Sequence, residues 1–182
     1  MRFGHRFTGT IEGYDEKGRG TFQLRGDKAT VGSGTIAIPF SAKGDEVVAT
    51  FIKRDHGTKI ARLESLAAAS PDRVAAPCPH AGVCGGCLWQ HLAYDAQLKL
   101  KREMINKALE NAGHDERIES VVSALEQFHH RNRMDYVVGW NGEVGLKEFG
   151  QWNRYVDLKT CLLLNDGANI AQRNAGFDSL NA

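Results

Sequence analysis

Three of the four cysteines lie within one short segment, and the fourth lies far downstream. In chain order they are Cys78, Cys84, Cys87 and Cys161. Two sulfurs three positions apart can converge on one inorganic centre, while a remote thiolate completes its ligand set. Gly85 and Gly86 separate the second and third cysteines, where the chain must turn tightly and bare N–H groups can face the sulfurs. The pattern predicts a metal or iron–sulfur site.

Four cysteines can also form disulfides, bind zinc or remain free thiols. The N-terminal residues are polar and lack the apolar stretch of a signal peptide. We therefore expect a cytoplasmic protein, in which thiols stay reduced rather than forming disulfides. A zinc ion held by four thiolates fits the local spacing as well as an iron–sulfur cluster does, and free or redox-active thiols are a lesser alternative.

Bulk composition limits the remaining possibilities. The chain has 182 residues, of which 25% are charged and 42% hydrophobic, which is typical of a globular protein. We expect no membrane association, because no apolar run approaches the length of a membrane span. The net charge of +1 gives no general argument for nucleic acid, so any such argument depends on local basic clusters. One cluster contains Lys99, Lys101, Arg102 and Lys107, and the other contains His129, His130, Arg131 and Arg133. Solvated faces are the alternative interpretation of both.

The N-terminal third has the pattern of a small β domain. Residues 6–64 contain five or so short strand-like segments separated by glycine-bearing turns, which favours an OB-like antiparallel barrel over residues 1–66. In the segment 46–54, Val47, Ala49 and Phe51 share one face, but the other face is also apolar, so this segment does not fix its own register. Residues 67–77 are rich in small residues and contain two prolines, which is typical of a linker.

The part that follows mixes a helix with hairpins. Tyr94 to Asn111 has helical periodicity, and we expect Leu98, Ile105 and Leu109 on its packed side. Strand-like segments then cover 134–140, 143–149 and 154–158, and Asn-Gly at 141–142 is a strong hairpin signal. The expected fold is mainly β with α: a barrel followed by an α+β domain that contains β-hairpins.

The residues quoted above also carry a family resemblance. The string from Cys78 to His91, followed by a basic helix, the segment His-Arg-Asn-Arg-Met-Asp-Tyr and a late Cys-Leu-Leu, resembles the iron–sulfur RNA uracil-5 methyltransferases. The barrel likewise resembles the TRAM domain, an OB-like RNA-binding module that precedes the cluster in many of these enzymes. The resemblance extends from about residue 5 to residue 165, and it identifies the chain with the N-terminal portion of such an enzyme.

The resemblance implies a cofactor, a partner and a set of site residues. The four cysteines would hold a [4Fe–4S] cluster with a structural role, inside an iron–sulfur domain over 78–182. The RNA-binding candidates are Gln90, His91, His130, Arg131, Arg133, Lys99 and Arg102; for Gln90 and His91 a structural role in the cluster loop is the alternative. The expected partner is RNA, with 23S ribosomal RNA as the substrate of the full-length enzyme, which also uses S-adenosylmethionine.

The catalytic features of this family are missing from the sequence. Its members attack uracil with a cysteine and remove a proton with a carboxylate, but all four cysteines here are assigned to the cluster. We find no glycine-rich strand-to-helix turn for S-adenosylmethionine. We therefore assign no catalytic residue, regard the iron–sulfur domain as incomplete, and expect no methylation by this chain alone. A free-standing RNA-binding iron–sulfur or zinc protein is the alternative function.

Overall fold

The computed structural model describes residues 2–24, 34–139, 143–151, 153–165 and 167. The chain forms two compact units that alternate along the sequence. Unit 1 comprises Met1–Ala75 and His91–Val121, and unit 2 comprises Ala76–Gln90 and Val122–Ala182. The sequence instead predicts consecutive domains on either side of residues 67–77. These expected domain bounds stay a prediction.

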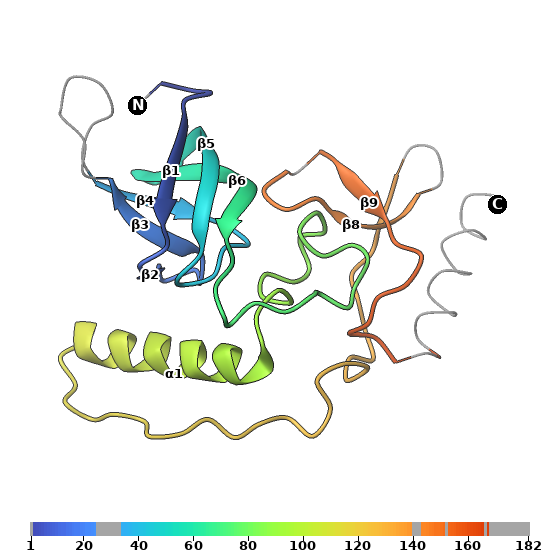
Figure 1. Cartoon of the computed structure of the whole chain (residues 1–182). Coiled ribbons are helices and arrows are strands. Elements are labelled where there is room, and N and C mark those ends of the chain that lie inside the picture. The colour runs from blue at the N-terminus through green and yellow to red at the C-terminus, as the bar shows by residue number, and fades with distance from the viewer. Residues whose placement is uncertain (1, 25–33, 140–142, 152, 166, 168–182) are drawn as a thin grey trace. The chain divides into compact units, whose positions relative to one another are not determined.

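Unit 1 contains a six-stranded sheet (Figure 1). Its strands are β1 (Arg6–Thr10), β2 (Gly13–Tyr14), β3 (Gly20–Leu24), β4 (Gly34–Ile38), β5 (Glu46–Asp55) and β6 (Thr58–Ala68). Their order across the sheet is β1-β5-β6-β4-β3-β2. Every neighbouring pair is antiparallel except β4 and β6, which run parallel. The expected β-rich architecture is confirmed, with this one departure from antiparallel pairing. The glycine-bearing stretch at 25–33 lies outside the described residues.

The strand β5 shows which of its two apolar faces enters the core. Val47, Ala49 and Phe51 are buried, whereas Val48 and Ile52 are only partly covered. The register between β5 and β6 shifts at three places, and such irregularities bend a strand and increase its twist. The curled sheet thereby encloses one hydrophobic cluster, made of Ile11, Phe22, Leu24, Ile36, Ile38, Val47, Ala49 and Ala61.

A buried ion pair anchors the segment after β6 to the sheet of unit 1. The Asp45 carboxylate is fully buried and accepts hydrogen bonds from Arg73 Nε at 2.8 Å and from the Ser70 backbone at 2.9 Å. Arg73 also donates to the Phe40 carbonyl at 2.7 Å. Burial alone would raise the pKa of Asp45, but the hydrogen bonds from Arg73, Ser70 and Ala42 lower it. Residues 70–73 are therefore anchored by side chains, although their composition is that of a linker.

The predicted helix is confirmed, but its buried face differs from the expected one. Helix α1 spans Tyr94–Asn111. Leu100 is its buried residue, with 3% of its surface exposed, whereas Ile105 is 46% exposed. The expectation for Ile105 was wrong because the apolar residues of this helix are spread around it, so periodicity alone does not select a face. No helix among the described residues is long and apolar enough to cross a membrane.

Unit 2 contains a three-stranded antiparallel sheet. Its strands are β7 (Val137–Val138), β8 (Val144–Lys147) and β9 (Tyr155–Asp157), in the order β7-β8-β9. The pairing of β7 with β8 fits the predicted hairpin, while its turn at 141–142 lies outside the described residues. Gly145 lets β8 and β9 approach closely, because a Cβ at this position would collide with the carbonyl of Val156.

Candidate metal centre

Backbone hydrogen bonds join the cysteine loop to the end of β8. The Gly85 N–H donates to the Lys147 carbonyl at 2.9 Å, and the Phe149 N–H donates to the Val83 carbonyl at 2.8 Å. Cys84 itself forms an isolated antiparallel β-bridge with Glu148. This pairing holds the part of the loop around Cys84 against the small sheet of unit 2.

A second pairing fixes the segment that follows the fourth cysteine. The His129 N–H donates to the Leu162 carbonyl at 2.7 Å, and the Arg131 N–H donates to the Leu163 carbonyl at 2.8 Å. The Leu164 N–H in turn donates to the carbonyl of Cys161 at 3.1 Å. The basic segment predicted to contact RNA is therefore attached to the segment that carries the last cysteine.

All four cysteines line a single cavity in unit 2. None of the four forms a disulfide, and Cys84 and Cys161 are buried while the other two are partly covered. The rest of the lining is mainly apolar, with Met134, Leu146 and Leu158 among its residues. Within the described ranges, no three His, Cys, Asp or Glu side chains form a group that could hold a metal ion. The structure thus gathers the predicted ligands, while the cluster itself stays a prediction.

Polar groups beside the sulfurs compensate in part for their burial. Burial raises the pKa of the Cys84 thiol, and a hydrogen bond from the Gly86 N–H, 3.4 Å from Cys84 Sγ, acts in the opposite direction. Burial likewise raises the pKa of Cys87, against a hydrogen bond from the Gln90 side chain. These donors favour the thiolate, which is the form that binds metals.

The two glycines of the loop are required by close packing. A Cβ at Gly85 would lie 2.9 Å from the Lys147 carbonyl oxygen, and one at Gly86 would lie 2.9 Å from Leu146 Cδ1. Both distances are shorter than ordinary contacts. The absence of side chains therefore lets the cysteine loop approach β8. Of the two glycine N–H groups, that of Gly86 is directed at a sulfur, whereas that of Gly85 donates to the Lys147 carbonyl.

Gln90 and His91 hold local structure in different units. The Gln90 side-chain carbonyl accepts the Cys78 N–H at 3.2 Å, so this residue braces the cysteine loop. The His91 carbonyl accepts the Val74 N–H at 3.0 Å, and its ring makes an edge contact with Phe40 at a centroid distance of 6.5 Å. These contacts favour the structural role for both residues, and RNA binding by either stays a prediction.

The predicted basic residues fall into two groups. His130, Arg131 and Arg133 are exposed in unit 2, where Arg133 pairs with Asp135 at 3.1 Å. In unit 1, Lys99 is exposed on α1 and Arg102 donates to the Glu119 carbonyl at 2.9 Å. The two groups belong to different units. RNA binding by these residues stays a prediction.

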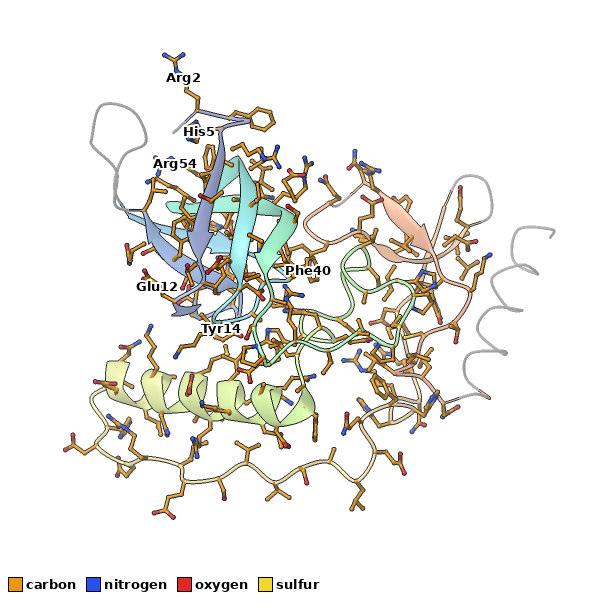
Figure 2. The ribbon with its side chains drawn as sticks, viewed as in Figure 1. Arg2, His5, Glu12, Tyr14, Phe40 and Arg54 are labelled. Carbon is orange, nitrogen blue, oxygen red and sulfur yellow. The ribbon has the colours of Figure 1, made fainter. Side chains whose placement is uncertain are left out.

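Sequence reasoning gave no role to two other sets of residues. His80 lies in the cysteine motif and lines the cysteine cavity, and the presence of a histidine among three cysteines was the signal that could have identified it. Arg2, His5 and Arg54 are exposed at the end of the barrel opposite Tyr14, as Figure 2 shows. No pattern in the sequence brings these three together, because they lie on different segments.

The chain is similar in sequence to several RNA methyltransferases. It is 42% identical to the tRNA (uracil(54)-C(5))-methyltransferase of Pyrococcus horikoshii over 128 residues, which are 70% of this chain and 30% of that protein. It is 36% identical to the 23S rRNA (uracil(747)-C(5))-methyltransferase of the same organism over 134 residues, which are 73% and 31% of the two chains. It is 31% identical over 180 residues to an uncharacterized RNA methyltransferase of Bacillus cereus, covering 95% and 37%. No family model matches the chain.

A solved structure agrees with these relatives. The crystal structure of Pyrococcus abyssi tRNA (uracil-54, C5)-methyltransferase in complex with S-adenosyl-L-homocysteine superposes with a TM-score of 0.67 at 30% identity, and the match covers 92% of this chain and 35% of that one. Fold and sequence thus place the chain among RNA methyltransferases. It belongs to the RNA uracil-C5-methyltransferase family, and it spans about a third of the length of these relatives.

Proposed function

We propose that this chain is the RNA-recognition and cluster-bearing N-terminal portion of an S-adenosylmethionine-dependent RNA uracil-C5-methyltransferase that acts in the cytoplasm. The observation that carries the proposal is the match of 92% of the chain, at 30% identity, to a solved enzyme of this family. The barrel of unit 1 would serve as the TRAM-like RNA-binding module. Methyl transfer would depend on a catalytic domain beyond this sequence, so the chain alone should be inactive.

The cysteine cavity would hold a [4Fe–4S] cluster. Four thiols line it, a backbone N–H already donates to one of their sulfurs, and two glycines lack the Cβ atoms that would collide with β8. This donor set suits a sulfur-ligated centre. When bound, the cluster would cross-link the cysteine loop with the segment around Cys161. Its contribution would therefore be to the shape of unit 2 rather than to methyl transfer.

The RNA surface would include the exposed basic residues next to that cross-link. Arg131 lies on the segment that pairs with Leu163, so its backbone is fixed while its side chain is exposed to solvent. A guanidinium held in this way can donate to phosphate oxygens. We propose 23S ribosomal RNA as the substrate of the full-length enzyme. Because relatives are named for tRNA as well as for 23S rRNA, transfer RNA is the competitor to test.

Metal analysis of the whole chain, purified without oxygen, tests the centre. We expect about four irons and about four sulfides per chain, with broad absorption near roughly 400 nm. One zinc per chain without iron would refute the cluster and leave a zinc-stabilised RNA-binding module. Competition between a 23S rRNA fragment and a tRNA for the same chain tests the substrate. Stronger binding of the tRNA would refute the ribosomal assignment.

A further inference from the structure

One buried nitrogen in the cysteine cavity has no hydrogen-bond partner. His80 lines this cavity, and within the described part of the chain its Nε2 atom is both inaccessible and unpaired. A buried polar nitrogen without a partner is costly, and folded proteins rarely leave one. The orphaned atom therefore indicates that a polar group is expected beside it.

The backbone of the cysteine loop fixes where this histidine lies. The His80 carbonyl accepts the Cys84 N–H at 2.9 Å and the Val83 N–H at 3.3 Å, and the Cys78 carbonyl accepts the Ala81 N–H at 3.1 Å. These bonds form consecutive turns between the first two cysteines. The imidazole is therefore positioned by the same loop that presents the sulfurs, rather than by a mobile surface segment.

No described group in the cavity lining accepts a hydrogen bond from this nitrogen. Besides the cysteines, the polar side chains of the lining are those of Gln90 and Thr160. The Gln90 carbonyl already accepts the Cys78 N–H at 3.2 Å. Because Nε2 has no partner, neither these groups nor any cysteine sulfur lies within bonding distance of it. A sulfur-containing centre bound by the four cysteines would bring acceptor atoms into the same cavity.

We propose that His80 positions and tunes the bound centre by donating its Nε2–H to one of the centre's own sulfur atoms. The proposal rests on the cluster assigned under the proposed function, because that cluster supplies the acceptor. A hydrogen bond to sulfur stabilises the reduced form, which carries the extra negative charge, and so raises the reduction potential. His80 would thus be a positioning residue with an electronic effect, and not a ligand.

Two substitutions distinguish hydrogen-bond donation by His80 from an effect of its packing. His80→Gln keeps an N–H at a similar distance from the backbone, whereas His80→Leu keeps the bulk and removes the donor. In a redox titration of the whole loaded chain, we expect His80→Gln to resemble the wild type. We expect His80→Leu to shift the ratio of reduced to oxidised centre about tenfold toward the oxidised form at a given potential, which is about 59 mV for one electron. His114→Leu, at an exposed position of unit 1, should change nothing.

Resonance Raman spectroscopy of the oxidised centre provides a second measurement that needs no reduction. We expect the Fe–S stretching bands to shift in His80→Leu and to keep their wild-type positions in His80→Gln. Unchanged bands and an unchanged potential in a fully loaded His80→Leu protein would overturn the proposal. Loss of iron from both variants would also overturn it, by showing that His80 binds the metal or only supports the loop. Absence of iron from the wild type would instead refute the cluster itself.

Discussion

His91 makes the stability of unit 1 depend on pH between about pH 8 and pH 5. The pKa of this histidine is lowered from 6.5 to about 4, mainly by burial and also by the nearby Arg73 cation, while a hydrogen bond to the Ser41 backbone and the Asp45 carboxylate act in the opposite direction. The unfolded chain therefore binds a proton more readily than the folded chain throughout this range. The stabilising contribution is complete above pH 6.5 and is lost progressively as the pH falls toward 4.

The size of the effect follows from these two pKa values. Proton linkage predicts that the free energy of unfolding falls by about 2 kcal/mol between pH 8 and pH 5 because of His91 alone. Asp45 adds little over this interval, because its pKa is lowered and its carboxylate stays ionised. His91→Gln removes the titrating ring. It should therefore abolish about 2 kcal/mol of the wild-type pH dependence, whatever it does to the stability at pH 8.

Urea unfolding of the whole chain measures this difference. The circular dichroism of α1 is a suitable signal because this helix belongs to unit 1, whereas the fluorescence of Trp89 would report on unit 2. His114→Gln is the matched control, because its side chain is 58% exposed, and it should retain the wild-type pH dependence. Parallel pH profiles for wild type and His91→Gln would refute the reasoning.

Three further substitutions test the other parts of the structure. Asp45→Asn should destabilise unit 1 by about 3–5 kcal/mol in the same urea assay, because it leaves the Arg73 guanidinium without its buried partner. Cys87→Ser should remove the bound centre and lower amide-exchange protection in unit 2 while the sheet of unit 1 stays protected, since unit 1 contains no cysteine. Arg131→Ala should weaken RNA binding and reduce its salt slope by about 1, as measured in titrations at several salt concentrations.

Each of these predictions has a control or a contrary outcome in the same chain. Asp135→Asn removes an exposed ion pair with Arg133 and should cost less than about 1 kcal/mol; an equal cost for Asp45→Asn would contradict the buried-pair argument. Equal loss of exchange protection in both units of Cys87→Ser would contradict their independence. Arg117→Ala changes an exposed arginine of unit 1, so an equal effect on RNA affinity would remove the special role of Arg131.

Local patterns in the sequence predicted the positions of helices and strands better than the contacts between them. Helix α1 begins and ends where periodicity, an early aspartate and a following glycine indicate. Its buried residue, Leu100, was missed because apolar residues occur on several sides of the helix and only the neighbouring element selects one. The parallel pairing of β4 with β6 was missed for a similar reason: alternation within a strand specifies a face but not the strand that lies beside it.

The same distinction applies to the candidate site. Spacing predicted a common site for the four cysteines, and they do line one cavity. The short interval between the first three is readable in the sequence, because residues three positions apart can converge on one centre. The loop glycines were expected at a tight turn, whereas the structure accounts for them by their close packing against Lys147 and Leu146. The position of His80 among the cysteines indicated that it lies near the site, but only the structure shows that its Nε2 atom is buried without a hydrogen-bond partner.

The distribution of buried residues explains why unit 2 would benefit from a cross-link. Among the described residues, the buried hydrophobic residues of unit 1 include Ile11, Phe22, Leu24, Ile36, Ile38, Val47, Phe51, Ile60, Leu92 and Leu100. In unit 2 they are Cys84, Val144, Leu158, Cys161 and Leu164. Two of these five residues are the proposed ligands themselves. The described residues of unit 2 thus gain little from apolar burial, and small folds with few buried side chains usually depend on a metal or a disulfide. A centre bound by the cysteines would therefore supply stability as well as geometry, and the RNA surface around Arg131 would depend on it.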